Sequence, residues 1–597
     1  MDGWMGQILR INLSDAEYRV EDLDPDLAED FIGGRGLASQ MLFDEVDPRV
    51  EPLSPENKVI FAVGPLTGTG VVGAARSMVV TKSPLTSGIT SSNLGGHFGP
   101  ELKFAGYDAI IIEGKSPEPV YLLINDENVE FKPAEHLWGK STSETEDMIQ
   151  AEIADSWKAR ETQIVCIGPA GENLVKFASI IHSGRAFGRS GAGAVMGFKN
   201  LKAIAVRGTK GITIADVDSF KEAAADFLEN KIKGSFFTEV RPALGTWYLV
   251  PMFKGAGMLP VRNYQAGIFE GVDKIDEKVM QSEILIGKKS CFACPCADTR
   301  LTKVTDPRFQ GEGEGPEYES WGKLGPDCGV NDIAAITKAS YICNEMGMDT
   351  ISMGGTIACA MELYEKGFLP KEDTGYQLNF GNAKALVELV EKTGLRQGFG
   401  DILAEGSYWL AEKYGHPEIS MVVKRQEFPA IHPQGSQLMG LAYATSNRGA
   451  CHTKASVSLD KRFEVAGQAT RLKQMQDYIA VIDASGLCWS VMMRPPLMIE
   501  EVSTFLRYAT GADYTDETMM LVGERIWNLE RVFNLKAGLT AQDDSLPKRI
   551  LEESVLTGEA EGQVIQLDKM LPEYYEARGW DKSGAPTSQK LAELGLS

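Results

Sequence analysis

Three of the nine cysteines of this chain lie within six residues, at Cys291, Cys294 and Cys296, beside a proline that breaks regular structure. Such a short loop is typical of a thiolate-bound metal centre. Cys488, far along the chain in the stretch 483–488, is able to bring a fourth sulfur. If the four sulfurs meet, a [4Fe-4S] cluster ties the middle of the chain to its C-terminal third. Thiolates suit iron and zinc alike, so a zinc ion and a cysteine-rich loop without metal stay open as alternatives.

The composition is that of an ordinary soluble protein, since 43% of the 597 residues are hydrophobic and 24% are charged. A net charge of −23 disfavours nucleic acid and anionic membranes as partners. No run reaches about 18 apolar residues, and the first residues lack the pattern of a signal peptide. Nine cysteines are an odd number without the regular spacing of a disulfide framework. We therefore expect a protein of the reducing cytoplasm, with no nucleic-acid or membrane partner.

Short apolar runs separated by glycine, proline and serine turns predict a β-rich region over residues 1–210. Among these runs are 59–63, 77–81, 109–112 and 163–167. Few helical patterns alternate with them, which favours sheet packed on sheet over a doubly wound domain. From about Val217 helical patterns take over, at 218–225, 332–346, 356–366, 383–393 and 472–482. We predict an α+β fold with domains at 1–210, 211–415 and 416–597, of which the second and third are mainly α-helical.

Glycine-rich stretches punctuate the N-terminal region, at 33–36, 64–70, 92–97 and 188–193. None is a phosphate loop or a dinucleotide fingerprint, because no Gly-Lys-Ser/Thr closes a loop and no G-x-G-x-x-G lies between a strand and a helix. Glycines do let backbone amides approach a large polar ligand closely. Beside Arg76, Asn93, Arg185 and Arg189, these stretches are able to hold a phosphate-bearing cofactor, although a single such glycine is more commonly just a turn.

Two six-residue segments resemble one another, Asn344–Asp349 and Asp483–Cys488. Each follows a predicted helix, and each carries a glycine where a residue in the left-handed conformation would end that helix. Both segments place a polar side chain one turn before the helix terminus and another just after it. Such a pair is suited to bind two similar halves of one ligand, whose ring N–H groups would donate to carboxylates and amides. Two ordinary glycine-terminated helices are the simpler alternative.

These features together resemble the tungsten- or molybdenum-dependent aldehyde:ferredoxin oxidoreductase family. The two paired segments resemble that family's D-x-x-G-L-[DC] pterin-binding motifs, and the cysteine loop resembles its C-x2-C-x3-C. The resemblance runs in the family's order from Gly3 to about Leu539. Further similar stretches are 33–37, 75–78, 92–96, 193–202, 315–319 and 444–452.

The resemblance implies tungsten or molybdenum held by the dithiolene sulfurs of two pterins, with a [4Fe-4S] cluster close by as the electron outlet. It implies a fold in which an N-terminal double β-sheet domain carries the bis-pterin cofactor and two helical domains close over it. By similarity, the residues against the pterin phosphates and the magnesium ion that bridges them are Arg76, Asn93, Arg185 and Ala186. Those that bind the pterins are Asn344, Asp349, Asp483 and Leu487, and those that ligate iron are Cys291, Cys294 and Cys488.

One departure from the family concerns the remaining cluster ligand. The family usually has a third cysteine four residues after the second, where this chain has Asp298, and Cys296 comes two residues early. We favour Cys296, because a hard carboxylate should hold iron less well in a cluster that prefers thiolates. Ligation by Asp298 and a three-iron cluster stay open.

Two residues match the family's catalytic pair. Glu319 matches the active-site glutamate and would take a proton, with Glu317 as its nearby competitor, since a low-dielectric pocket raises a carboxyl pKa toward neutrality. His452 matches the active-site histidine and would polarise the substrate carbonyl. Without the resemblance, a lone histidine is more commonly structural. Cys451 and Cys328, near these residues in the sequence, are expected to be buried small hydrophobic residues.

The resemblance therefore implies an enzyme that oxidises a small aldehyde with water to a carboxylic acid and passes electrons through the cluster to ferredoxin or an iron-sulfur partner subunit. It also implies a homodimer or larger complex. Two alternatives stay open. One is a reductase of an aromatic acyl-CoA, such as a tungsten-containing benzoyl-CoA reductase subunit, on the same scaffold. The other is a zinc-stabilised scaffold protein without catalysis.

Overall fold

Two six-stranded mixed sheets form the N-terminal region of the computed structural model, which describes residues 1–457, 459–493 and 497–596. The first sheet has the order β2 (Glu17–Asp22), β1 (Gln7–Asn12), β6 (Ala109–Glu113), β3 (Val59–Val63), β4 (Ser77–Lys82), β5 (Ile89–Leu94). The second has the order β11 (Arg185–Phe187), β10 (Ile180–His182), β9 (Gln163–Cys166), β12 (Leu201–Arg207), β7 (Val120–Asn125), β8 (Asn128–Pro133). The pairs β1–β6 and β7–β12 are parallel, and their neighbours in each sheet pair antiparallel.

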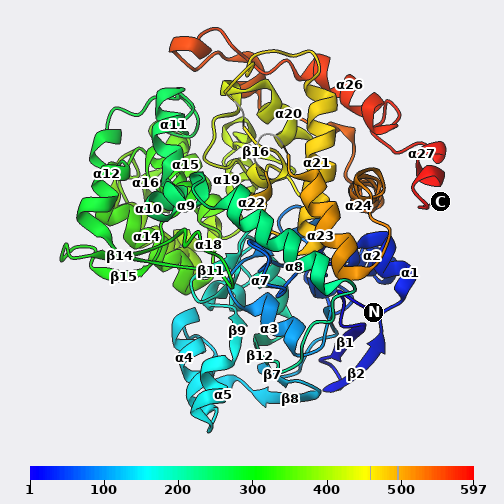
Figure 1. Cartoon of the computed structure of the whole chain (residues 1–597). Helices are drawn as coiled ribbons and strands as arrows, with labels where there is room; N and C mark the ends of the chain where they lie inside the picture. Colours follow the sequence, from blue (N-terminus) through cyan, green and yellow to red (C-terminus); the bar gives the residue numbers. More distant parts are fainter. Residues whose placement is uncertain (458, 494–496, 597) are drawn as a thin grey trace.

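The two sheets pack against one another around a shared hydrophobic core. Leu9 and Phe61 of the first sheet belong to this core together with Val165 and Ile204 of the second, and all four are fully buried. The ring of Phe61 meets that of Phe187 edge-on, with centroids 5.7 Å apart, which joins β3 to β11. Sheet packed on sheet is therefore confirmed. Figure 1 shows this strand-rich region, blue to cyan, at one end of the molecule and the helices of the later chain beyond it.

Helices dominate the chain after β12, as predicted. Those over the predicted stretches are α8 (Val217–Asp226), α14 (Ile333–Met346), α15 (Thr350–Glu365), α17 (Ala383–Gly394) and α21 (Gln468–Ser485). Helix α15 begins six residues before the predicted start, because the Asp349 side chain accepts the N–H groups of Ile351 and Ser352 and caps it there. The predicted α+β class is confirmed. None of the helices in the described residues has the length and apolar character needed to cross a membrane.

The two similar segments do form matching turns. Gly347 ends α14 with φ 72° and Gly486 ends α21 with φ 87°, both in the left-handed region. Asp349 is then the N-cap of α15, and Cys488 is the N-cap of the short helix α22 (Trp489–Met492). The prediction of two glycine-terminated helices, each followed by a polar residue, is confirmed.

A small third sheet surrounds the cysteine loop and was not predicted. The loop connects β13 (Leu285–Lys289) to β14 (Thr299–Val304), and β15 (Gly311–Glu314) completes the sheet. Strands β13 and β15 carry lysines, glutamates and glycines, so they lack the apolar pattern that predicts a strand. The Phe292 N–H donates to the Gly96 carbonyl at 3.1 Å, which fastens the cysteine loop beside the turn that follows β5.

A buried ion pair ties the N-terminal region to the C-terminal one. Arg35 of α2 (Gly34–Glu45) donates two hydrogen bonds, each 2.7 Å long, to the two carboxylate oxygens of Glu530 in α24 (Asp516–Lys536). The guanidinium also lies over the Trp527 ring, 5.1 Å from its centroid. Both charged side chains are almost completely buried, at 1% and 3% exposure. The pair therefore fixes how these two helices meet, although they are nearly 500 residues apart.

Candidate functional site

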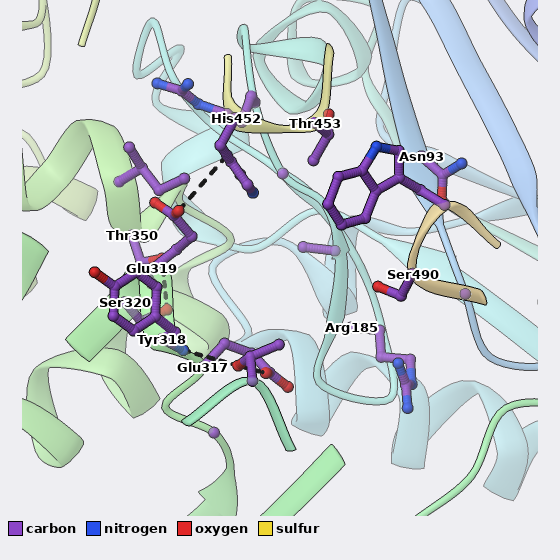
Figure 2. A pocket seen from close by; sticks show the side chains of 18 of the residues that line it. Asn93, Arg185, Glu317, Tyr318, Glu319, Ser320, Thr350, His452, Thr453 and Ser490 are labelled. Atoms are coloured by element: carbon purple, nitrogen blue, oxygen red, sulfur yellow. Dashed lines mark hydrogen bonds and ion pairs between the residues drawn. The ribbon is translucent and has the colours of Figure 1, made fainter. Parts of the chain in front are cut away.

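A cavity of about 540 Å³ is lined by residues from all three predicted domains. Five arginines face it, which are Arg76, Arg185, Arg189, Arg241 and Arg448. In a chain with a net charge of −23, this concentration of positive charge favours an anionic ligand. Figure 2 shows Glu319 and His452 on one side of this space and Asn93, Arg185 and Ser490 on the other.

The four residues predicted to face phosphates all line the cavity. Arg76 lies just before β4, Asn93 lies in β5, and Arg185 with Ala186 begins β11. Arg185 donates to the Thr299 hydroxyl, but its Nε is buried without a hydrogen-bond partner. The indole Nε1 of Trp489, another lining residue, is also buried and unpartnered. Buried donors in native proteins are normally paired, so both atoms indicate a polar ligand at this wall.

The predicted pterin residues divide into two groups. Asn344 and Asp349 line the cavity, and Arg189 donates to Asp349 at 3.2 Å. Asp483 does not line it, but it accepts a hydrogen bond from the amide of Asn93 at 3.2 Å. Leu487 does not line the cavity either, since its side chain is fully buried in the helical core.

Asp483 is held by two cations. Lys454 donates to its Oδ2 at 2.6 Å, and Arg35 approaches the same oxygen at 3.4 Å. Burial alone would raise the pKa of Asp483, but Lys454 and Arg35 outweigh it and hold the pKa below the usual value. Asp483 is therefore an ionised carboxylate one residue behind the cavity wall, in contact with it through Asn93.

The predicted metal ligands converge on a smaller pocket beside the cavity. Cys291, Cys294 and Cys296 of the loop line it together with Cys488 and Asp298. The prediction that Cys488 meets the distant cysteine loop is therefore met in the geometry. Within the described residues, no three His, Cys, Asp or Glu side chains are arranged as a ready-made site for a metal ion.

Arg76 lies between this sulfur pocket and the cavity and lines both. Its Nη2 donates to the sulfur of Cys488 at 2.9 Å, and its Nη1 donates to Asn93 Oδ1 at 3.0 Å. A Cβ on Gly95 would lie 2.9 Å from the sulfur of Cys291 and 3.2 Å from the Arg76 guanidinium carbon. A glycine is therefore needed at this position to let the backbone approach both groups.

The predicted catalytic residues face one another across the cavity. The Nδ1 of His452 lies 3.9 Å from Oε1 of Glu319, which is too long for a hydrogen bond, and this nitrogen has no partner. Oε2 of Glu319 accepts the backbone N–H of Ala430 at 2.6 Å. The side chains are 15% and 25% exposed for Glu319 and His452, and this exposure is toward the cavity that both line.

The two groups have strongly shifted pKa values. Burial raises the pKa of Glu319 to about 7, although the Ala430 N–H and nearby Arg189 favour the carboxylate. Burial and the surrounding cations Arg189, Arg448 and Lys454 lower the pKa of His452 well below its ordinary value. At neutral pH the imidazole is uncharged, and Glu319 can exchange a proton. A carboxyl of raised pKa in a cavity is a strong candidate for proton transfer.

Glu317, the competitor of Glu319, has a different environment. It precedes α13 (Tyr318–Leu324) and accepts a hydrogen bond from the Thr246 hydroxyl. Burial and the negative charge of Asp298 raise its pKa. Glu317 lines the cavity but has no printed contact with His452, whereas Glu319 faces that ring directly.

Cys451 differs from the buried hydrophobic residue that the sequence predicts. It is fully buried, but its sulfur accepts from Arg448 Nε at 3.3 Å and from Nη2 at 2.9 Å. Burial would raise the pKa of this thiol, yet Arg448, Lys454 and Arg189 outweigh it and lower the pKa to about 7. Cys328 does follow the prediction, since it is buried and burial holds its pKa well above the usual value.

The cations of the site are the residues that sequence reasoning missed. Arg448 and Lys454 flank His452 in a stretch that the resemblance had already marked, so their position was a usable signal. Arg241 had no such signal, because it lies in a short helix outside every motif.

The fold and the site together define an oxidoreductase whose cofactor cavity adjoins a pocket of cysteine sulfurs. The chain matches the family models described as the N-terminal domain of aldehyde ferredoxin oxidoreductase, over residues 8–208, and as domains 2 and 3, over 223–596. The chain belongs to the aldehyde ferredoxin oxidoreductase family.

Relatives and solved structures agree with this family. The chain is 46% identical over 615 residues to the tungsten-containing aldehyde ferredoxin oxidoreductase of Pyrococcus furiosus, with 100% of both chains covered. It is 46% identical over 611 residues to the protein of the same description from Thermococcus kodakarensis, again with 100% of both covered. It is also similar to a chain of the active site complex BamBC of benzoyl coenzyme A reductase in complex with 1,5-dienoyl-CoA. The TM-score is 0.86 at 26% identity, covering 100% of this chain and 97% of that chain.

Proposed function

We propose that this protein oxidises small aldehydes to carboxylic acids with water, and that it passes two electrons, one at a time, to ferredoxin or to an iron-sulfur partner subunit. One observation carries this proposal: a cavity lined by five arginines adjoins a pocket of four cysteines in a chain of this family. The relatives described as tungsten-containing at 46% identity favour tungsten over molybdenum.

The cavity suits a bis-pyranopterin cofactor with two phosphates. Arg76 and Arg185 would hold the phosphates, and Asn93 with Ala186 would lie beside the bridging magnesium ion. Asn344 and Asp349 would bind one pterin, and Asp483 and Leu487 the other. The unpartnered Nε of Arg185 and Nε1 of Trp489 support a polar ligand here. When bound, the metal-dithiolene group supplies the two-electron redox chemistry.

The sulfur pocket suits a [4Fe-4S] cluster as the electron outlet. Cys291, Cys294 and Cys488 would each ligate one iron, and the fourth iron has two candidate ligands on the same wall, Cys296 and Asp298. Cys291 and Cys294 are only partly buried, so the cluster would lie near enough to the surface for electron transfer to a partner.

His452 and Glu319 divide the work on the substrate. The uncharged imidazole would donate its N–H to the aldehyde oxygen and so polarise the carbonyl carbon. Glu319, with its pKa near neutrality, would take a proton from the water that adds to this carbon. Their facing positions leave room for one small reacting group between them.

The nine free cysteines suit a reducing compartment, so we place the reaction in the cytoplasm. As in the family resemblance, we propose a homodimer or a larger complex. The similarity to the benzoyl coenzyme A reductase complex supports a second candidate, the reduction of an aromatic acyl-CoA.

Elemental analysis of anaerobically purified protein tests the cofactors, and a panel of aldehydes with a viologen dye as acceptor tests the reaction. We expect tungsten, about four irons per chain, and dye reduction that depends on aldehyde. Zinc without iron, or reaction with benzoyl-CoA but with no aldehyde, would overturn the proposal.

A further inference from the structure

The sulfur pocket offers five side chains for the four irons of a cluster, so one of them is not a ligand. We propose that the carboxylate of Asp298 ligates the fourth iron and that Cys296 is a packed, unligated thiol. This inference rests on the cluster of the proposed function and names the ligand that the sequence left open.

The backbone of the loop places Asp298 by the same turn that places Cys294. Ala293 has φ 49° and Ala297 has φ 46°, both in the left-handed region, which costs a residue other than glycine about 1–2 kcal/mol. Cys294 follows the first alanine and Asp298 follows the second. In this repeat Cys296 corresponds to Phe292, which precedes Ala293 and is not a ligand.

The surroundings of Phe292 and Cys296 agree with this correspondence. The Phe292 ring packs edge-on against those of His97 and Phe104, with centroids 6.4 and 5.9 Å away. Cys296 is 4% exposed and is a member of the apolar core that also contains Phe237. Both side chains are therefore directed into packed apolar surroundings.

Asp298 is the more open of the two candidates. Its side chain is 24% exposed, and it lines both the sulfur pocket and the cofactor cavity, whereas Cys296 lines the sulfur pocket alone. A ligand must present its donor atom to the space that the metal fills. Cys291 and Cys294 are partly open as well, so Asp298 resembles them in this respect and Cys296 does not.

Arg241 fixes the orientation of the Asp298 carboxylate. Its Nη2 lies 3.2 Å from Oδ2, and the Arg241 side chain is only 4% exposed. One oxygen is thereby held by the guanidinium, which leaves Oδ1 for iron. A carboxylate carries the same charge as the thiolate it replaces, so the cavity and the pocket keep their charge balance. An oxygen ligand binds cluster iron less firmly than a thiolate, so this iron should be the first to leave.

The experiment uses the full chain purified without oxygen and then oxidised in steps with ferricyanide. Iron content and the low-temperature EPR spectrum are followed in the wild type, in Asp298→Cys and in Cys296→Ala. We expect the wild type and Cys296→Ala to fall from about four irons to about three together, with the EPR signal of a three-iron cluster. Asp298→Cys should keep its fourth iron over the same oxidation.

Two results would overturn the inference. In one, Cys296→Ala already holds three irons as purified while the wild type resists oxidation. In the other, Asp298→Cys loses iron exactly as the wild type does. If Asp298→Cys fails to fold, Asp298→Asn serves in its place, because the amide keeps the shape but removes the anionic donor, and three irons as purified are then expected. A wild type without any iron would instead refute the proposed function itself, whatever the variants do.

Discussion

Glu319 and Glu101 are both buried glutamates that accept one backbone N–H and whose pKa burial raises to about 7. Only Glu319 faces the cavity. We expect Glu319→Gln to lower kcat by about 10²–10⁴-fold, because the amide cannot take a proton. Glu101→Gln is the matched control and should leave kcat within about twofold of the wild type. Equal losses in both variants would show that the effect is structural.

The pH dependence follows from the same raised pKa. Glu319 acts as a base only in its deprotonated form, so kcat should rise with pH through about 7 in the wild type. The rise should be absent in the residual activity of Glu319→Gln. His452 contributes no opposing limb near neutrality, since its pKa is lowered well below the ordinary value. A rate measured with a good acceptor that stays flat across this range contradicts the assigned role.

Cys451 supports another prediction at this scale, because its sulfur is the acceptor for two N–H groups of buried Arg448. Cys451→Ala leaves that guanidinium without this partner, at an expected cost of about 1–3 kcal/mol. Cys343→Ala is the control, since Cys343 is equally buried but packs in the apolar helical core. The apparent melting temperature should fall further in Cys451→Ala. A larger fall in the control would argue that Arg448 finds another acceptor.

At the scale of elements, the turn between α21 and α22 depends on Gly486. A Cβ there would lie 2.1 Å from the Thr67 hydroxyl, and that hydroxyl donates to the backbone carbonyl of Arg76. Gly486→Ala should therefore displace both Arg76 and the N-terminus of α22, and we expect less iron and less tungsten per chain by elemental analysis.

Gly415→Ala is the control for this turn, because Gly415 has a similar left-handed φ of 77° but open space around it. It carries only the conformational cost of about 1–2 kcal/mol. Metal content should stay at the wild-type level. Loss of metal in both variants would trace the effect to general destabilisation.

Elements were predictable from sequence where a local signal sets them. Gly347 and Gly486 end their helices as predicted, because the left-handed conformation is a property of the residue itself. The strand β13 was missed, because its exposed lysines hide the apolar alternation. The convergence of Cys488 with the cysteine loop depended on the family resemblance, since nothing local in either segment points to the other.

At the scale of the whole molecule, the Arg35–Glu530 pair joins the first and last regions. Arg35→Met should destabilise the protein by about 3–5 kcal/mol, because Glu530 is left buried and unpaired. The double variant Arg35→Met, Glu530→Leu should recover most of this loss. Urea unfolding, followed by tryptophan fluorescence, measures both. If the double variant is no better than the single one, the pair is not what holds α2 on α24.

Contacts of this range lie beyond sequence reasoning. Arg35 belongs to a glycine-rich stretch that was assigned to ligand binding, yet its guanidinium is spent on Glu530 and Asp483. The cavity arginines likewise come from three regions, and only the fold shows that they share one space. The division at 210 and 415 stays a prediction.

Arg76 donates one N–H to Cys488 and another to Asn93, so a single cation is shared by the sulfur pocket and the cofactor cavity. Negative charge gained on either side draws on the same stabilisation. We therefore expect an electron that settles at one redox group to make the other harder to reduce. Traffic between them would then favour emptying the inner group before the next substrate is turned over.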